Sequence, residues 1–171
     1  VVCGVGRKGS LAVRSLRDNG KQVVAVEHDA TCAHTEAVLE RGAHVVRGDA
    51  RDRALLRKAG VPRAAHLVVV CGSDATCAEV AAQARELMAS SSGATLSCIA
   101  DISDPQLCAL LRREEIALRR EIPFRLDFFN AQEAGARILL REHPPDSRGR
   151  SSGEAHMVVV GLGDFGARLV T

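Results

Sequence analysis

One glycine pattern occurs twice in this chain, once near each end. Residues 2–9 read V-C-G-V-G-R-K-G and residues 159–166 read V-V-G-L-G-D-F-G, so in both copies an apolar segment runs into G-x-G-x-x-G. The first glycine permits a tight turn out of a strand, the second permits close approach of a pyrophosphate, and the third permits close packing of the following helix. Phosphates then lie at the helix N-terminus, where free N–H groups and the helix dipole favour negative charge. Two copies around a strand–helix repeat are much stronger evidence than one.

Short valine-rich segments alternate with helix-like segments, which is typical of βαβ units. These segments are continuously apolar, as expected for parallel strands that are covered on both faces. The predicted strands are residues 1–3, 23–27, 44–47, 67–71 and 96–100. We therefore predict an α/β fold with a Rossmann-like, doubly wound parallel sheet, and the first βα unit of a second such domain at the C-terminus.

Local signals indicate where the intervening helices end and begin. A glycine stands just before three of the predicted strands, where a left-handed residue would end a helix. These glycines are Gly20, Gly42 and Gly60. Residues 103–106 read S-D-P-Q, and residues 130–133 begin with Asn and end with Glu. The first segment is typical of a capping box with proline near the first turn of the helix, and the second is similar.

The chain divides at a segment that has no apolar residue to anchor it. Residues 144–153 read P-P-D-S-R-G-R-S-S-G, a composition typical of linkers. We therefore predict a Rossmann-like domain at 1–143, a linker at 144–155 and the truncated start of a second domain at 156–171. One strand and the start of one helix cannot bury an apolar face alone. This fragment is expected to pack on the first domain or on a second copy of the chain.

Composition excludes several classes of function. A formal net charge of +2, an aromatic content of 2% and the absence of Trp and Tyr argue against a nucleic-acid partner. The six cysteines form no C-x-x-C and the six histidines no H-x-x-x-H, so neither a disulfide framework nor a metal site is expected. The cysteines are interpreted as small buried side chains in a reducing compartment. They are Cys3, Cys32, Cys71, Cys77, Cys98 and Cys108.

Glu27 ends the second predicted strand, about 20 residues after the glycines. An acidic residue at this place holds the adenosine ribose in dinucleotide folds. Each hydrogen bond to its carboxylate would contribute roughly 1.5–3 kcal/mol. The same charge would repel a 2′-phosphate, so NAD(H) or an adenine nucleotide is favoured over NADP(H). The alternative is a solvated glutamate at a strand end.

Other polar residues follow the predicted strands and have two interpretations each. Arg7 begins the first helix and is either a phosphate ligand or a surface arginine. Asp49 follows the third strand, where it would face the adenine or cap the next helix. After the fourth strand, Ser73 or Asp74 is expected to cap a helix, and a ligand contact there is the less favoured interpretation.

These motifs are similar in order and spacing to those of RCK/KTN (TrkA-N) nucleotide-binding domains, over residues 1 to about 143. The motifs that carry the resemblance are Gly4-x-Gly6-Arg7-x-Gly9, Glu27-x-Asp29, Gly48-Asp49-Ala50, Ala59-Gly60-Val61, Ala64-Ala65 and the strand at 67–71. The resemblance implies a cytosolic domain that regulates a potassium channel or transporter at the inner face of the membrane. It implies dimer contacts through the helix at 130–141, hence a homodimer or higher oligomer. The second glycine copy resembles the opening of a tandem domain.

The resemblance also assigns ligand contacts to four loops. By this reading the first glycine loop surrounds the phosphates, Glu27 holds the ribose, the loop after the third strand holds the adenine, and the loop after the fourth strand borders the far half of the ligand. The residues so assigned are Gly4, Gly6, Arg7, Lys8, Gly9, Glu27, Asp49, Ala50, Cys71, Gly72 and Ser73.

Three residues depart from the family pattern. Lys8 stands where an aromatic or apolar residue is usual, although Phe165 fills that place in the second copy. Asp101 replaces an arginine after the fifth strand, and Cys77 replaces a common asparagine. These changes concern the nicotinamide side of a dinucleotide more than its adenosine side.

An enzyme is the main alternative to a regulatory domain. The chain has no tyrosine for a Tyr–Lys pair, and no room for a catalytic domain after the first one. A methyltransferase is disfavoured by the G-x-G-x-x-G spacing. We therefore predict a cytoplasmic nucleotide-sensing domain without catalytic residues that controls potassium or other cation transport. NAD(H) is the leading ligand and ADP, ATP and AMP remain open. The alternative function is the cofactor domain of an NAD-dependent oxidoreductase whose catalytic domain lies elsewhere.

Overall fold

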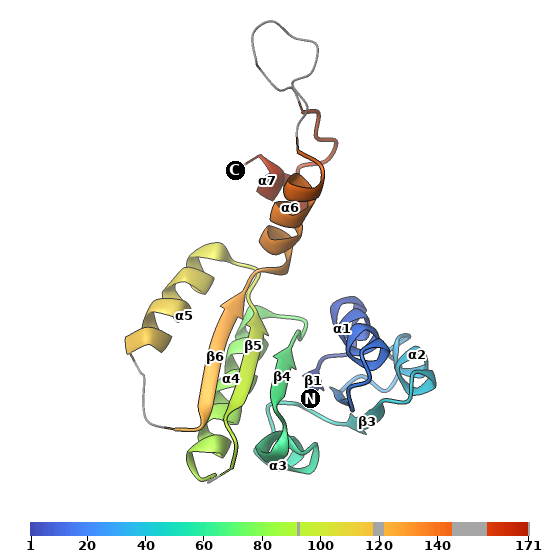
Figure 1. Ribbon diagram of the computed structural model, residues 1–171, viewed down its shortest axis with the longest axis vertical. Helices are drawn as coiled ribbons and strands as arrows, with labels where there is room; N and C mark the ends of the chain where they lie inside the picture. The colour runs from blue at the N-terminus through green and yellow to red at the C-terminus, as the bar shows by residue number, and fades with distance from the viewer. Residues whose placement is uncertain (92, 118–121, 145–156, 171) are drawn as a thin grey trace, which may run out of the picture. The chain divides into compact units, whose positions relative to one another are not determined.

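The computed structural model describes residues 1–91, 93–117, 122–144 and 157–170. The chain separates into two compact units, Val1–Phe129 and Asn130–Thr171. Figure 1 labels the helices and strands of both units. Nearly all of the predicted linker lies outside the described residues, so the boundaries at 143 and 156 stay a prediction.

The first unit is built on a six-stranded parallel sheet with the strand order β3-β2-β1-β4-β5-β6 (Figure 1). The strands are β1 (Val2–Cys3), β2 (Val24–Glu27), β3 (His44–Arg47), β4 (His66–Val69), β5 (Leu96–Asp101) and β6 (Phe124–Phe129). The strand order reverses between β1 and β4, and ligands of such sheets bind at the carboxyl ends of the strands beside this reversal. The predicted Rossmann-like, doubly wound fold is confirmed.

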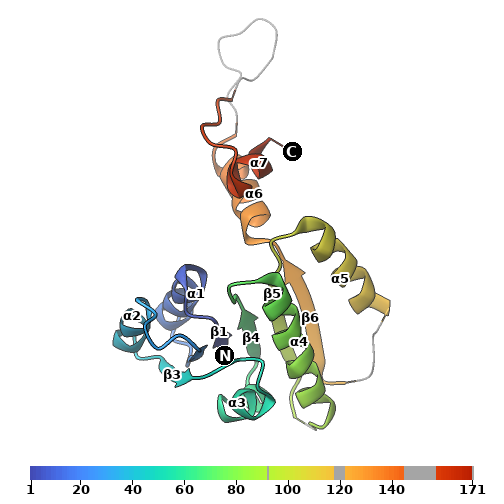
Figure 2. The ribbon, with the colours of Figure 1, turned by 180° about the vertical axis from the view of Figure 1, so that it is seen from behind.

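Helices cover both faces of this sheet. They are α1 (Arg7–Asp18), α2 (Thr35–Glu40), α3 (Arg53–Lys58), the short 3-10 helix η1 (Val61–Arg63), α4 (Asp74–Ala89) and α5 (Pro105–Ala117). Val2 of β1 packs in one apolar layer with Val13 of α1. The next residue, Cys3, packs in a second layer with Leu56 of α3 and Val80 of α4. Figure 2 shows α4 in front of the sheet when the molecule is seen from behind.

The alternation of side chains along each strand explains these two layers, because successive residues of a strand point to opposite faces. The strands are too apolar for one face to remain in water, so both faces are covered. None of the described helices is both long and apolar enough to cross a lipid bilayer.

The predicted helix signals are largely confirmed. The glycines at 20, 42 and 60 all have positive φ, between 72° and 84°. The Ser73 hydroxyl caps α4 by accepting the N–H of Thr76 at 3.2 Å. In the S-D-P-Q segment the cap is Asp104, one residue later than in a capping box that begins at Ser103, and its Oδ1 accepts the N–H of Gln106 at 2.8 Å.

Strand β6 was not predicted from the sequence. Its residues F-R-L-D-F-F mix buried aromatic side chains with exposed charged ones. β6 lies at one edge of the sheet, pairs only with β5, and has exposed residues that alternate with buried and half-buried ones. An edge strand that is exposed on one face is expected to alternate in this way.

The second unit contains α6 (Ala131–Glu142) and α7 (Asp164–Leu169). The side chain of Asn130 caps α6, as predicted, by accepting the N–H of Glu133 at 2.9 Å. The ring of Phe165 in α7 lies against Gly135 of α6, and a Cβ at Gly135 would be 3.2 Å from that ring. The second glycine copy thus packs on a helix that the sequence assigns to the first domain.

The strand expected before α7 is not formed in the described part of the chain. Residues 157–163 carry no strand assignment. The side chains of Val158 and Val160 are 88% and 95% exposed. The expectation of a strand was wrong here because a strand requires a neighbouring strand to pair with.

Gly9 supports a test of how closely α1 packs against β1. A Cβ at Gly9 would be 1.8 Å from the carbonyl oxygen of Gly4, whereas a Cβ at Gly6 would meet nothing within 4 Å. We expect Gly9→Ala to destabilise the protein by about 3 kcal/mol, because backbone must move to admit the methyl group. Gly6→Ala is the matched control and should change stability by no more than about 0.5 kcal/mol. Urea unfolding of both variants measures the difference, and equal stabilities would contradict the packing argument.

Candidate functional site

A cavity of about 680 Å³ opens at the carboxyl ends of β1, β2, β3 and β4. All but one of the residues predicted for the site line it, and these are Gly4, Gly6, Arg7, Lys8, Glu27, Asp49, Ala50, Cys71, Gly72 and Ser73. The exception is Gly9, which faces the backbone of Gly4 and has a packing role. Ligand contact by the lining residues stays a prediction.

The loop between β1 and α1 exposes backbone to this cavity. Gly4 has φ +89°, and a Cβ there would lie 2.8 Å from the carbonyl oxygen of Val70. Gly6 has open space around it. No side chain caps α1, whose first turn contains no acidic residue. A helix start of this kind is suited to an anion because free N–H groups and the helix dipole favour negative charge there.

Glu27 ties this loop to β2. Its Oε2 accepts the N–H of Val5 at 2.7 Å, and its Oε1 accepts the N–H of Asp29 at 2.8 Å. The residue is only 9% exposed, so the carboxylate faces the glycine loop and not bulk water. Oε1 also lies 3.4 Å from Nδ1 of His28, so Oε2 is the oxygen that keeps a lone pair for one more donor. The residue at the end of β2 therefore both shapes the loop and presents acceptors to the cavity.

The ammonium group of Lys8 forms an ion pair with Asp101 Oδ2 at the end of β5. The Asp101 side chain is 4% exposed and that of Lys8 is 40% exposed. Lys8 lines the cavity but is already bound to a carboxylate. The two residues that depart from the family pattern here therefore form an ion pair with each other. They are far apart in the sequence, so the sequence alone did not predict this pair.

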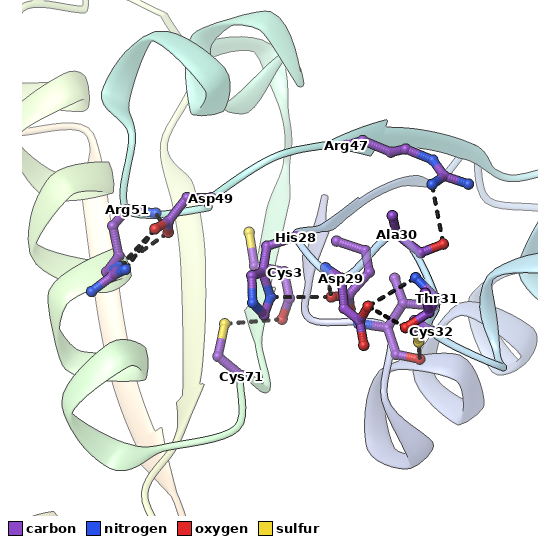
Figure 3. Close-up of polar contacts among 12 residues, drawn as sticks. Cys3, His28, Asp29, Ala30, Thr31, Cys32, Arg47, Asp49, Arg51 and Cys71 are labelled. Atoms are coloured by element: carbon purple, nitrogen blue, oxygen red, sulfur yellow. Dashed lines mark hydrogen bonds and ion pairs between the residues drawn. The ribbon is translucent and has the colours of Figure 1, made fainter.

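Asp49 is held by Arg51, a residue that sequence reasoning did not select. Asp49 Oδ1 accepts the backbone N–H of Arg51 at 2.9 Å, and Oδ2 accepts from Nη2 at 2.6 Å (Figure 3). These hydrogen bonds lower the pKa of Asp49 to about 2. The cap of α3 is instead Asp52, which accepts the N–H of Ala54 at 2.7 Å. The helix-cap alternative for Asp49 is thus wrong.

Further cavity residues lay next to predicted ones. Arg51 adds a guanidinium group to the cavity, and His28, Asp29 and Cys32 follow Glu27. Asp29 belongs to the Glu27-x-Asp29 motif of the family resemblance, whereas Arg51, His28 and Cys32 have no signal in the sequence beyond their place in the same loops as Asp49 and Glu27.

The loop after β4 forms the opposite wall. Cys71 is half-buried there, and its thiol donates to the carbonyl of Cys3 at 3.6 Å (Figure 3). Asp74 begins α4 and accepts the N–H groups of Ser103 and Asp104 at 2.8 and 2.9 Å. This wall is therefore fixed to the segment that follows β5. The interpretation of all cysteines as buried side chains was wrong for Cys71 and Cys32, which line the cavity.

Comparison with protein families gives the class of this domain. The TrkA-N domain model matches residues 1–118. The chain belongs to the TrkA-N domain family, as the resemblance implied. A protein of Methanothermus fervidus is 32% identical over 87 residues, which are 51% of this chain and 14% of that protein. The match thus spans about one seventh of that relative's length.

Solved structures share the fold at low sequence identity. The TrkA-N domain of inner membrane protein YbaL from Escherichia coli has a TM-score of 0.62 at 19% identity, covering 83% of this chain and 93% of that one. The Kef CTD of Shewanella denitrificans, in its AMP-bound form, has a TM-score of 0.58 at 20% identity, with coverages of 88% and 82%. GsuK bound to ADP has a TM-score of 0.63 at 18% identity, covering 98% of this chain and 38% of that one.

The ion pair of Asp49 predicts a pH effect. Its folded pKa of about 2 lies below the ordinary 3.8. Ionised Asp49 therefore stabilises the fold above about pH 4, and this contribution is lost as the pH falls towards 2. Because the pair is exposed, its contribution is below about 1 kcal/mol. We expect Arg51→Met to raise the pKa of Asp49 towards 3.8, measured by NMR titration of its carboxyl carbon. Arg53→Met, which removes a cation without contact to Asp49, should leave it unchanged.

Proposed function

We propose that this chain is a nucleotide-sensing regulatory domain that binds an adenine nucleotide and controls potassium or other cation transport by a membrane channel or transporter. The observation that carries the proposal is the Glu27 carboxylate beside an uncapped glycine loop in one cavity. This combination offers acceptors for sugar hydroxyls next to donors for phosphate oxygens. The potassium-transport part rests on membership of the TrkA-N family.

The residues of the cavity fit a nucleotide. Gly6 leaves room for phosphate oxygens at the backbone of the loop, and Arg7 adds positive charge beside it. Glu27 has free acceptor capacity for ribose hydroxyls. Asp49 and Ala50 lie at the end of the cavity formed after β3, where the adenine is proposed to bind. In this proposal a bound nucleotide acts through its charge and its contacts with the cavity, and it undergoes no reaction.

The AMP-bound form of the Kef CTD and GsuK bound to ADP support the proposal of adenine mono- and diphosphates as ligands. The adenosine half of NAD(H) would make the same contacts with the cavity. Lys8 and Asp101, which form an ion pair, are two of the departures from the family pattern, and the resemblance assigns these departures to the nicotinamide side of a dinucleotide. This favours the mononucleotides over NAD(H), in contrast to the order expected from the sequence.

A regulatory domain needs two states whose nucleotide affinities differ. A difference of about 1–3 kcal/mol corresponds to a change of roughly 5- to 150-fold in the equilibrium of the attached partner. The proposal includes a cytoplasmic position at the inner face of the membrane and a homodimer or higher oligomer. It also includes the assignment of residues 156–171 to the start of a tandem domain.

A panel of AMP, ADP, ATP, NAD⁺, NADH and NADP⁺ in a thermal-shift assay tests the ligand class. We expect the adenine nucleotides to raise the melting temperature and NADP⁺ to have no effect, because Glu27 repels a 2′-phosphate.

Gly6→Ala should lower the affinity for AMP at least tenfold by placing a methyl group where the phosphate approaches. Gly163→Ala is the control, since its added Cβ also meets nothing within 4 Å and Gly163 does not line the cavity. The proposal fails if no nucleotide shifts the melting temperature. Substrate-dependent NADH oxidation by the full chain would favour the oxidoreductase instead.

Lys8 allows a test of phosphate recognition. Asp101→Asn removes the carboxylate that holds Lys8, so the ammonium group becomes available to phosphates. We expect ADP to bind up to about fivefold more tightly, because the free energy of a partly exposed ion pair corresponds to a change in affinity of this size. Adenosine, which has no phosphate, should bind unchanged. In a Lys8→Met background the Asp101→Asn change should have no effect on ADP affinity. Calorimetric titration measures these affinities, and an equal gain for adenosine would exclude this role of Lys8.

A further inference from the structure

A second cavity opens at the other end of the sheet. It has a volume of about 570 Å³ and lies at the amino ends of β2 and β3, where the chain also leaves α1 and α3. Because the strands are parallel, this end is opposite to the carboxyl ends that form the nucleotide cavity. The two cavities share no lining residue. The volume is in the range of small-molecule sites, roughly 300–1,000 Å³.

The side chains that line this second cavity are positively charged and include no carboxylate. The cations are Arg17, Lys58 and Arg63, and His44 adds an imidazole. In the described part of the chain, the side chains of Lys58 and Arg63 have neither an ion pair nor a hydrogen bond. This cavity, called here the basic cavity, therefore differs from the nucleotide cavity, which carboxylates also line.

Arg17 is already oriented within the basic cavity. Its Nε donates to the carbonyl of Arg41 at 2.9 Å, and its Nη1 donates to the carbonyl of Lys21 at 2.9 Å. A Cβ at Gly42 would be 2.9 Å from Nη2, so the guanidinium group lies against a residue without a side chain. Nη2 is the nitrogen that keeps its donors for a ligand. A guanidinium group held in this way loses little further freedom when it binds one.

The helix dipole accounts for only part of this charge. Arg17 and Lys58 lie in the last turns of α1 and α3, where a cation stabilises the helix end. His44 instead begins β3, and Arg63 ends the short helix η1. Four separate segments thus bring basic side chains to one cavity, which indicates a binding site for an anion of high charge.

We propose that the basic cavity binds an anion with two or more linked phosphoryl groups, either a free compound or the headgroup of a lipid. Guanidinium groups match phosphate oxygens in a planar, bidentate geometry, and an ammonium group adds a point charge. Arg17 supplies the fixed donor, whereas Lys58 and Arg63, which are exposed, close on the ligand. This site is separate from the proposed nucleotide function, since no residue of the nucleotide cavity takes part.

The experiment titrates the full chain with inorganic tripolyphosphate in a calorimeter. Every protein in the series carries Gly6→Ala, so that the glycine loop of the nucleotide cavity contributes little to binding. We expect the further changes Lys58→Gln and Arg63→Gln together to lower the affinity at least about tenfold, because two ion pairs are lost. Arg14→Gln is the matched control, since Arg14 is an exposed arginine of α1 that does not line the basic cavity, and it should leave the affinity unchanged.

Vesicles separate the two sources of the phosphoryl groups. The chain is sedimented with vesicles of phosphatidylcholine alone or with added phosphatidylinositol bisphosphate. Binding to the bisphosphate vesicles without affinity for tripolyphosphate assigns a lipid headgroup, and the reverse result assigns a free compound. Loss of either kind of binding in the chain with Lys58→Gln and Arg63→Gln supports the proposal.

Equal affinities of the Lys58→Gln, Arg63→Gln chain and the Arg14→Gln chain overturn the proposal, as does the absence of both kinds of binding. Without Gly6→Ala, the Lys58→Gln, Arg63→Gln chain should bind AMP as the parent does, which also shows that it is folded. A chain that binds tripolyphosphate in the basic cavity but binds no nucleotide overturns the proposed function and leaves this inference in place.

Discussion

The hydrogen bond from the backbone of Val5 to Glu27 is the constraint on which the site depends. It fixes the glycine loop to the end of β2, and a second bond from Gly4 to the carbonyl of Val26, at 2.9 Å, fixes the turn itself. The left-handed Gly4 then directs the chain into α1. Without this carboxylate the N–H of Val5 would be buried without a partner, at a cost of roughly 1–3 kcal/mol. One residue therefore serves both the fold of the loop and the acceptor surface of the cavity.

Two of the cations that line the cavity are already paired with carboxylates of the chain. Arg51 is bound by Asp49, and Lys8 by Asp101. An anionic ligand must compete with these carboxylates, so its affinity depends on the difference between two sets of ion pairs and not on the number of positive charges. This competition is a physical basis for distinguishing ligands that differ only in phosphate number. It also means that binding can change contacts within the protein, as a sensor requires.

The sequence predicted the features that are local or periodic. Valine-rich runs located β1 to β5, and the left-handed position of Gly60 followed from its place before a strand. The strand β6 was not predicted because only one of its faces is apolar. The pair of Lys8 and Asp101 was not predicted for another reason. The two residues are 93 positions apart in the sequence, and only the strand order brings the carboxyl ends of β1 and β5 to the same edge of the sheet. The charge of Lys8 or of Asp101, taken alone, indicated only a residue that differs from the family pattern.

The position of Asp101 gives the Lys8 ion pair a mechanical consequence. Asp101 is the last residue of β5 and lies in register with Phe129, the last residue of β6. The N–H of Ile102 donates to the carbonyl of Phe129 at 2.7 Å, and the next residue, Asn130, begins the second unit and caps α6. Continuous bonded contacts thus run from the glycine loop through β5 to the end of the first unit. Under the proposed function, a ligand that draws Lys8 from Asp101 would act on this path at its start, because Asp101 is the last residue of β5.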